Sequence, residues 1–172
     1  MGQTMITVAF LVLLTYLVLS ANRLLLDSES SSLSSQAEQT SVDLVDALLA
    51  EVGRKKYDQK VSSGDTVKPT FTAPASLGPE TGESFTVPES APFQSGTKYN
   101  DVDDYNGYSR IVDATQIKGF ILRVRVYYVQ DARHTTTPYT GSPYPDFKRI
   151  DVSVEHPLYM PSATTYSRIF TY

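Results

Sequence analysis

The sequence contains no cysteine and no tryptophan, and it has only two histidines among 172 residues. Without cysteine the chain forms no disulfide, no thiolate metal site and no cysteine nucleophile. His134 and His156 stand in no metal-ligand spacing, and we expect His156, before Pro157, in an exposed loop. The sequence also has no phosphate-binding glycine loop and no nucleophile elbow. It therefore predicts a protein that is not an enzyme and has no cofactor.

Charge is absent from residues 1–22. Over the whole chain, 15 basic and 19 acidic side chains give a formal net charge of −4. This mildly acidic balance argues against a surface for nucleic-acid phosphates. Arg110, Arg123 and Arg125 have tyrosines nearby, but the alternation around them indicates a sheet face and not a site for single-stranded nucleic acid. We predict no nucleic-acid partner.

The uncharged segment contains an apolar run, residues 5–21, that is close to the roughly 20 apolar residues needed to span a bilayer. It could be a cleaved secretory signal, a single-pass membrane anchor, or an anchor that can leave the bilayer and form a filament core. A signal is disfavoured because no basic region precedes the run and Ser20, Ala21 and Asn22 make a poor cleavage site. The other two interpretations assign residues 1–26 to one hydrophobic helix and differ in the role of the residues after it.

Residues 27–59 predict an amphipathic continuation of that helix. No proline or glycine occurs between residues 3 and 52, and apolar residues from Leu26 to Val52 recur at spacings of three, four and seven. Gly53, followed by three basic residues, is typical of a helix end. A helix of about fifty residues would be about 75 Å long, and its apolar stripe needs a partner. The serine-rich residues 27–36 leave a flexible stalk as the alternative.

Prolines and glycines spread through residues 60–98 exclude a helix or a central strand there. The segment predicts a long surface loop, with short extended pieces near residues 70–73 and 84–87. A loop of this length is unusual within one domain unless it has a function. It either contacts an adjacent subunit or is a poorly ordered excursion.

Residues 99–172 predict an antiparallel β head. Apolar and polar side chains alternate along residues 118–129 and 149–155, and residues 166–172 suggest a third strand. We expect one face of the sheet to lie on the amphipathic helix. On the other face, Arg123 and Arg125 would oppose Asp151 and Glu155. The residues assigned to the covered face are Phe120, Leu122, Val124, Val126, Ile150, Val152 and Val154.

One acidic segment is the only candidate ion site. Asp101, Asp103 and Asp104 offer oxygen ligands of the kind that calcium prefers. Their spacing does not fit an EF-hand loop, and Asp and Asn side chains commonly hold their own backbone in turns. We favour such a turn, keep calcium as the weaker alternative, and assign no metal.

In this order of segments the chain resembles type IV pilins and pseudopilins. The resemblance is carried by residues 43–58 at the helix end, the acidic residues 101–108 and the late strand 148–154. It implies an α+β fold with a long N-terminal helix, hydrophobic and then amphipathic, and an antiparallel sheet laid on its second half. Two family features are not found: a basic leader ending in glycine, and a glutamate at the fifth mature position. Met5 holds that position if Met1 is the first mature residue, and Thr7 holds it if cleavage follows Gly2.

The resemblance implies a structural subunit of an extracellular filament at the cell surface. Its precursor would lie in the inner membrane, and export machinery would assemble it into a helical homo-oligomer. Thr4, Thr7 and Thr15 would bond either between helices or to their own backbone. The residues assigned to the central helix bundle are Met5, Val8, Phe10, Leu13, Leu17, Leu24, Leu33, Leu44 and Leu48.

An alternative stays open beside the filament. The same chain could be a single-pass membrane-anchored ectodomain, or a minor pseudopilin, that binds a partner or surface without forming the filament body. Tyr139, Tyr144 and Tyr159 lie in proline-rich segments and could make adhesive contacts, because tyrosine joins a large apolar body to a polar tip. Packing between subunits would explain these tyrosines equally well.

Overall fold

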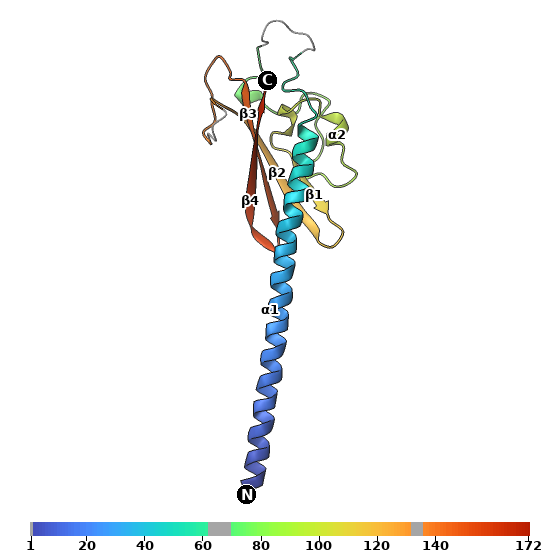
Figure 1. Cartoon of the computed structure of the whole chain (residues 1–172). Helices are drawn as coiled ribbons and strands as arrows, with labels where there is room; N and C mark the ends of the chain where they lie inside the picture. The colour runs from blue at the N-terminus through green and yellow to red at the C-terminus, as the bar shows by residue number, and fades with distance from the viewer. Residues whose placement is uncertain (1, 62–69, 132–135) are drawn as a thin grey trace.

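The computed structural model describes residues 2–61, 70–131 and 136–172. A single long helix, α1 (Gly2–Val52), carries a head at its C-terminal end, and the N-terminal half of the helix extends away from that head (Figure 1). The described part of the head contains four strands, the one-turn helix α2 (Ser95–Lys98) and two 3₁₀ turns, η1 (Pro74–Ser76) and η2 (Asp103–Tyr105). The fold class is α+β, as predicted.

Helix α1 has 51 residues and runs through the serine-rich segment without a break. The helix is uninterrupted because it contains no proline, which would break a backbone hydrogen bond, and no glycine after Gly2, which would lower helix stability. The Gly53 N–H donates to the Leu49 carbonyl at 2.9 Å as the helix ends. Thr7 and Thr15 donate to the carbonyls four residues earlier, at 2.7 and 2.8 Å. These two hydroxyl groups therefore bond the backbone of their own helix.

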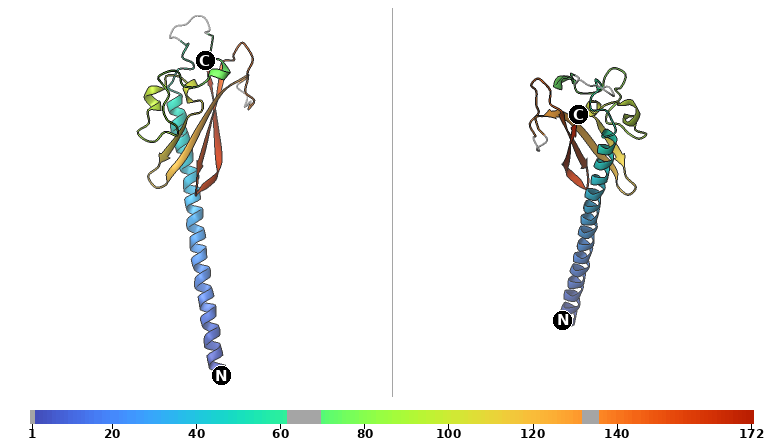
Figure 2. Two further views of the ribbon diagram at one scale, coloured as in Figure 1. Left: turned by 180° about the vertical axis from the view of Figure 1, so that it is seen from behind. Right: turned by 45° about the horizontal axis from the view of Figure 1, so that its top comes forward.

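Only the C-terminal part of α1 is covered by the head. The buried positions follow a helical spacing of three and four residues and so form one face. The apolar members of that face share the main core with side chains of the sheet, and Figure 2 shows this half of α1 beside the sheet. The buried positions are Ala37, Ser41, Val45, Leu48, Leu49 and Val52.

The four strands form one antiparallel sheet in the order β1-β2-β3-β4. Strand β2 (Lys118–Val129) has the predicted bounds, whereas β3 (Phe147–His156) is longer than predicted. Strand β4 (Met160–Thr171) begins six residues before the predicted start, and β1 (Ser109–Asp113) was not predicted. Backbone pairing extends these strands through residues that lack apolar alternation.

The face of the sheet against α1 holds the main core. The seven sheet residues that the sequence assigned to this face are all buried, with at most 4% of their surface exposed. His156 continues the same face and is buried, so its expected place in an exposed loop is wrong. Its Nε2 lies 2.8 Å from the Lys118 carbonyl, and its ring stacks on Tyr159. Strand β3 thus extends past the point where its apolar pattern stops.

The opposite face carries charged pairs. Arg123 bonds Glu155 at 2.7 Å, as the alternation predicted. Asp151, which lies opposite Arg125 in the ladder, is instead held by Arg149 at 2.8 Å and by the Tyr127 hydroxyl at 2.8 Å. The Arg125 guanidinium lies 5.1 Å from the centre of the Tyr127 ring. Both acids therefore face the arginines across the ladder as predicted, but Asp151 forms its ion pair with Arg149 in place of Arg125.

The proline-rich segment follows the prediction only in part. Residues 70–73 and 84–87 form no strand, and the segment contains η1 and α2. Glu89 makes an isolated parallel bridge with Arg110. Of the loop tyrosines, Tyr139 and Tyr144 are half-buried and pack on a second core of Tyr57, Phe71 and Tyr128.

A polar network fastens the end of α1 to the head. The Glu51 carboxylate accepts hydrogen bonds from the hydroxyls of Tyr105 and Ser95, both at 2.8 Å, and pairs with Arg110 at 3.0 Å. Nearby, the Tyr108 hydroxyl donates to the buried carboxylate of Glu89 at 2.6 Å. The Glu51 carboxylate is half-buried and that of Glu89 is buried. Each has hydrogen-bond donors, which offset the cost of removing it from water.

Candidate functional site

The part of α1 that projects from the head is the first candidate site. Fifteen large apolar side chains between residues 5 and 26 are exposed, from 47% for Leu14 to 76% for Met5. Five of them are consecutive, from Phe10 to Leu14, and steps of 100° per residue distribute these five around the whole helix. A helix that is apolar on all sides is normally surrounded by lipid or by other protein.

The residues assigned to a helix bundle divide into two groups. Met5, Val8, Phe10, Leu13, Leu17 and Leu24 are all more than half exposed on the projecting helix. Leu33 is half-buried near the edge of the head, and Leu44 packs partly against the core. Leu48 is completely buried beneath the sheet. Its assignment to a bundle is wrong, because the helix face that carries it already covers the chain's own core.

Helix α1 is long and apolar enough to cross a membrane by its length and composition. The apolar window lies near the N-terminus, and none of it is buried inside the protein. A core helix of a soluble protein would be mostly covered. The projecting half of α1 is therefore a candidate for insertion into a membrane.

The acidic turn is the second candidate site. The Asp101 carboxylate accepts hydrogen bonds from the backbone N–H groups of Asp103 and Asp104, at 2.7 and 3.3 Å. The Asp104 carboxylate accepts from those of Asn100 and Asp101, at 2.8 and 3.1 Å. Gly107 follows with a φ of +80°, which favours glycine. These bonds form the favoured turn, in which carboxylates hold their own backbone.

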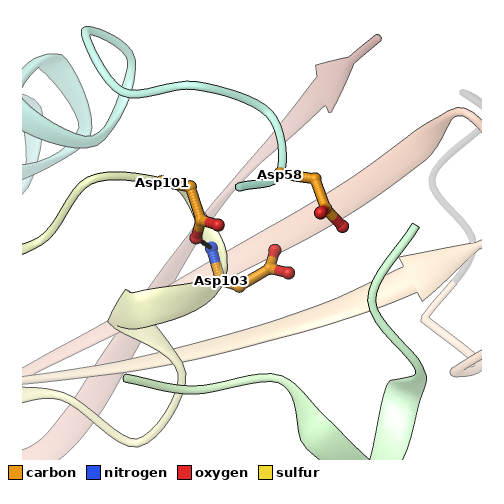
Figure 3. A group of neighbouring side chains, drawn as sticks. All are labelled: Asp58, Asp101 and Asp103. Atoms are coloured by element: carbon orange, nitrogen blue, oxygen red, sulfur yellow. Dashed lines mark hydrogen bonds between the residues drawn. The ribbon is translucent and has the colours of Figure 1, made fainter. Parts of the chain in front are cut away.

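The carboxylates form two groups that differ from the predicted calcium set. Asp58, Asp101 and Asp103 bring carboxylate oxygens within 4.8 Å of one another, and so do Glu80, Asp101 and Asp104. Figure 3 shows the carboxylates of Asp58 and Asp103 approaching each other, while Asp101 bonds the Asp103 backbone. Asp101, Asp103 and Asp104 do not converge as one set of ligands.

A side-chain cation already lies in the first group. Lys148, which is fully buried on β3, places its ammonium beside Asp58 at 3.3 Å and in direct contact with Asp103. Its positive charge compensates the carboxylates that would otherwise require an ion. The arrangement is an internal ion-pair network.

In the second group, a proton relieves the repulsion between carboxylates. Burial, with hydrogen bonds to Glu83 and Asp104, raises the pKa of Glu80 to about 8. Burial and the nearby Asp104 charge raise the pKa of Asp101 to about 6. Burial also raises the pKa of Asp104, so a proton held by Glu80 can bridge these two carboxyl groups.

Comparisons of the chain with models of known protein families, with curated proteins and with solved structures find no match. The layout of a long apolar N-terminal helix followed by an antiparallel four-stranded sheet is compatible with a pilin-like fold.

The folded protein should be more stable at about pH 5 than at about pH 8. Glu80 and Asp101 have raised pKa values in the folded state, whereas in the unfolded chain they ionise at about pH 4. At pH values between the unfolded and the folded pKa, the folded state binds more protons than the unfolded state. The free energy of unfolding therefore falls as the pH rises. Thermal unfolding in detergent at both pH values measures this. Glu80→Gln should reduce the difference, and equal midpoints for the unmodified protein would contradict the prediction.

Sequence reasoning did not identify Lys148, Asp58 or Glu80 as members of these groups. They come from three segments that are distant in sequence, and no catalytic or metal-binding motif contains them. Asp58 and Lys148 lie in segments that carry the pilin resemblance, but the resemblance gives them no role. The one available signal was Lys148, which occupies an inward-facing position of the alternating strand β3. A lysine at such a position indicates a buried partner of opposite charge.

Proposed function

We propose that this protein is a pilin-like structural subunit of an extracellular filament, in which N-terminal helices pack into a central bundle and heads form the outer surface. The observation that carries the proposal is the all-round apolar half of α1, which projects uncovered from a folded head. A bundle of such helices would cover every side of each one. The layout of the chain is compatible with a pilin-like fold, and assembly into a filament is the step that we add to it.

The energetics of burial support assembly from water but not from lipid. Each large apolar side chain that leaves water contributes about 1.5–3 kcal/mol, and fifteen are available between residues 5 and 26. Such a total greatly exceeds the cost of association. In a bilayer the same side chains are already out of water, so this gain vanishes. A subunit stored in the membrane would need machinery to extract it.

The second candidate function is that of a single-pass membrane-anchored ectodomain. The observation favouring it is that the same helix meets the length and composition of a membrane span. In this case residues 5–26 stay in lipid and each head acts alone. The two functions differ in whether the helix beyond the membrane-length segment must be covered by a neighbour.

Leu33→Asp separates the two functions. Leu33 lies outside residues 5–26, so an added charge there leaves insertion into a membrane intact. It belongs neither to the main core nor to the side chains packed against that core, so the head should still fold. We expect Leu33→Asp to abolish filaments, because a charge would have to be buried between packed helices. Electron microscopy of the extracellular fraction, with circular dichroism of the purified protein, measures both filament formation and folding.

Ser31→Asp is the matched control. It adds the same charge to an exposed position about 200° away around the helix, and we expect filaments from it. An unmodified protein that remains in the membrane fraction as single copies would refute the filament and leave the anchored ectodomain. Filaments from Leu33→Asp would show that this part of the helix does not pack against neighbours.

A further inference from the structure

The internal ion-pair network around Lys148 has the composition of a reaction site. Lys148 Nζ donates to the Tyr57 carbonyl at 2.7 Å and to Asp58 Oδ2 at 3.3 Å, and it also contacts Asp103 Oδ1. Lys148, Asp58 and Asp103 are each fully buried, with no exposed surface. An amine and two carboxyl groups thus meet in a space closed to bulk water.

Aromatic rings form the walls of this space. Lys148 Nζ lies 4.3 Å from the centre of the Tyr57 ring and 5.2 Å from that of Tyr128. The Tyr57 ring packs in turn on Phe71 at 5.0 Å. An apolar enclosure strengthens the electrostatic interactions inside it. Because it keeps bulk water out, it also favours a condensation that releases a water molecule.

The environment drives the two carboxyl groups toward opposite protonation states. Burial raises the pKa of Asp103 to about 7, even though the Lys148 charge opposes this shift. Burial also acts on Asp58, but hydrogen bonds from Thr72 and Lys60, together with the Lys148 charge, hold its pKa below the usual range. A neutral Asp103 carboxyl group is suited to be attacked by an amine, and an ionised Asp58 carboxylate is suited to accept a proton.

The hydrogen bonds around Asp58 and Asp103 agree with these opposite protonation states. The Thr72 N–H donates to Asp58 Oδ2 at 2.7 Å, and the Lys60 N–H donates to Asp58 Oδ1 at 3.0 Å. These bonds stabilise the ionised form of Asp58. Asp103 Oδ2, by contrast, is buried and has no hydrogen-bond partner among the described residues. A hydroxyl group at that oxygen could therefore leave without breaking a hydrogen bond to a described residue.

We propose that Lys148 and Asp103 become joined by an intramolecular amide bond, which the chain forms by itself with Asp58 as the base. The inference concerns the head alone and stands whether or not the protein forms filaments. It assigns a covalent cross-link to a chain that has no cysteine.

The reaction balances without an added reagent. The Asp58 carboxylate takes one proton from the Lys148 ammonium, and the freed nitrogen lone pair attacks Cγ of the protonated Asp103 carboxyl group. This attack forms the C–N bond and a tetrahedral intermediate, whose collapse breaks the C–O bond to the hydroxyl. Asp58 transfers its proton to that hydroxyl, which leaves as water, and takes the second proton from nitrogen. The products are a neutral amide, one water molecule and a protonated Asp58.

The cross-link would join the start of β3 to η2, two segments that are 45 residues apart in sequence. Closing a loop of this size restricts the unfolded chain, as a disulfide does. It would also lock the turn that faces the end of α1, where the Lys56 backbone bonds residues 100 and 102. The head would then resist unfolding without any need for an oxidising compartment.

Mass spectrometry of the full chain, purified in detergent, tests the proposal. We expect an intact mass below that of the sequence by one water molecule, and a protease digest that contains a branched peptide joining residues 103 and 148. A mass equal to that of the sequence would overturn the proposal. A branch at Asp58 in place of Asp103 would overturn the assignment of the electrophile.

Two variants test the chemistry. Lys148→Met removes the nucleophile and should have the full mass of its sequence; a persisting loss of water would place the modification elsewhere. Asp58→Asn keeps the size of the base but cannot accept the proton, so the cross-linked fraction should fall sharply. Complete cross-linking of Asp58→Asn would refute the role of Asp58. If either variant fails to fold, the mass of the unmodified chain still decides whether the amide exists.

Discussion

A chain that lacks residues 1–26 should be soluble without detergent and should unfold at the same temperature as the full-length protein. The removed segment carries fifteen exposed large apolar side chains. The buried residues of α1 begin only at Ala37, so the deletion removes no part of the core that the structure describes. Exposed apolar area drives association, whereas stability depends on the area that the head buries.

Sedimentation in aqueous buffer and thermal unfolding by circular dichroism measure the two parts of this prediction. A second deletion, of residues 1–40, provides the comparison, because it also removes the buried Ala37. The second chain should unfold at a lower temperature than the first. If the chain lacking residues 1–26 is itself strongly destabilised, the projecting helix contributes to the head in a way that its exposure does not explain.

Leu48→Ala should lower the free energy of unfolding by about 2–5 kcal/mol, the usual cost of truncating a buried leucine. Leu48 is completely buried, in contact with the core formed by α1 and the sheet. Its loss leaves a cavity where the helix docks on the head. Urea denaturation followed by tyrosine fluorescence measures the change, since the chain has twelve tyrosines and no tryptophan.

Leu24→Ala makes the same chemical change on the same helix and serves as the control. Leu24 is 71% exposed, so its truncation should leave the stability of the head within about 0.5 kcal/mol of the original. We expect the reverse order of effects on filament formation. Equal destabilisation by the two substitutions would contradict the division of α1 into a projecting half and a docked half.

The elements that follow a regular pattern could be predicted from sequence. A proline-free and glycine-free run, and the glycine after it, are sufficient to define α1, because backbone hydrogen bonds in a helix are local. Strands β2 and β3 could be identified because their side chains alternate between a covered and an uncovered face. The turn at residues 100–107 was predictable for a similar reason, since its carboxylates bond backbone groups only a few residues away.

The elements that depend on distant contacts could not be predicted in this way. Strand β1 and the first half of β4, before the predicted start at residue 166, exist because a neighbouring strand pairs with their backbone, and most side chains of β4 remain exposed. The difference between Leu24 and Leu48 is likewise invisible in the helical spacing, which is the same for both. It is decided by where the sheet ends along the helix.

The sequence by itself determined the long helix, its uncharged first half and the alternating strands, because these features depend on local backbone geometry and on side-chain periodicity. Tertiary structure alone decided where along the helix the covered part begins, that His156 is buried, and that Lys148 meets Asp58 and Asp103. These outcomes depend on contacts between residues that are far apart in the chain. Such contacts form only when the sheet packs on the helix and excludes water from the space between them.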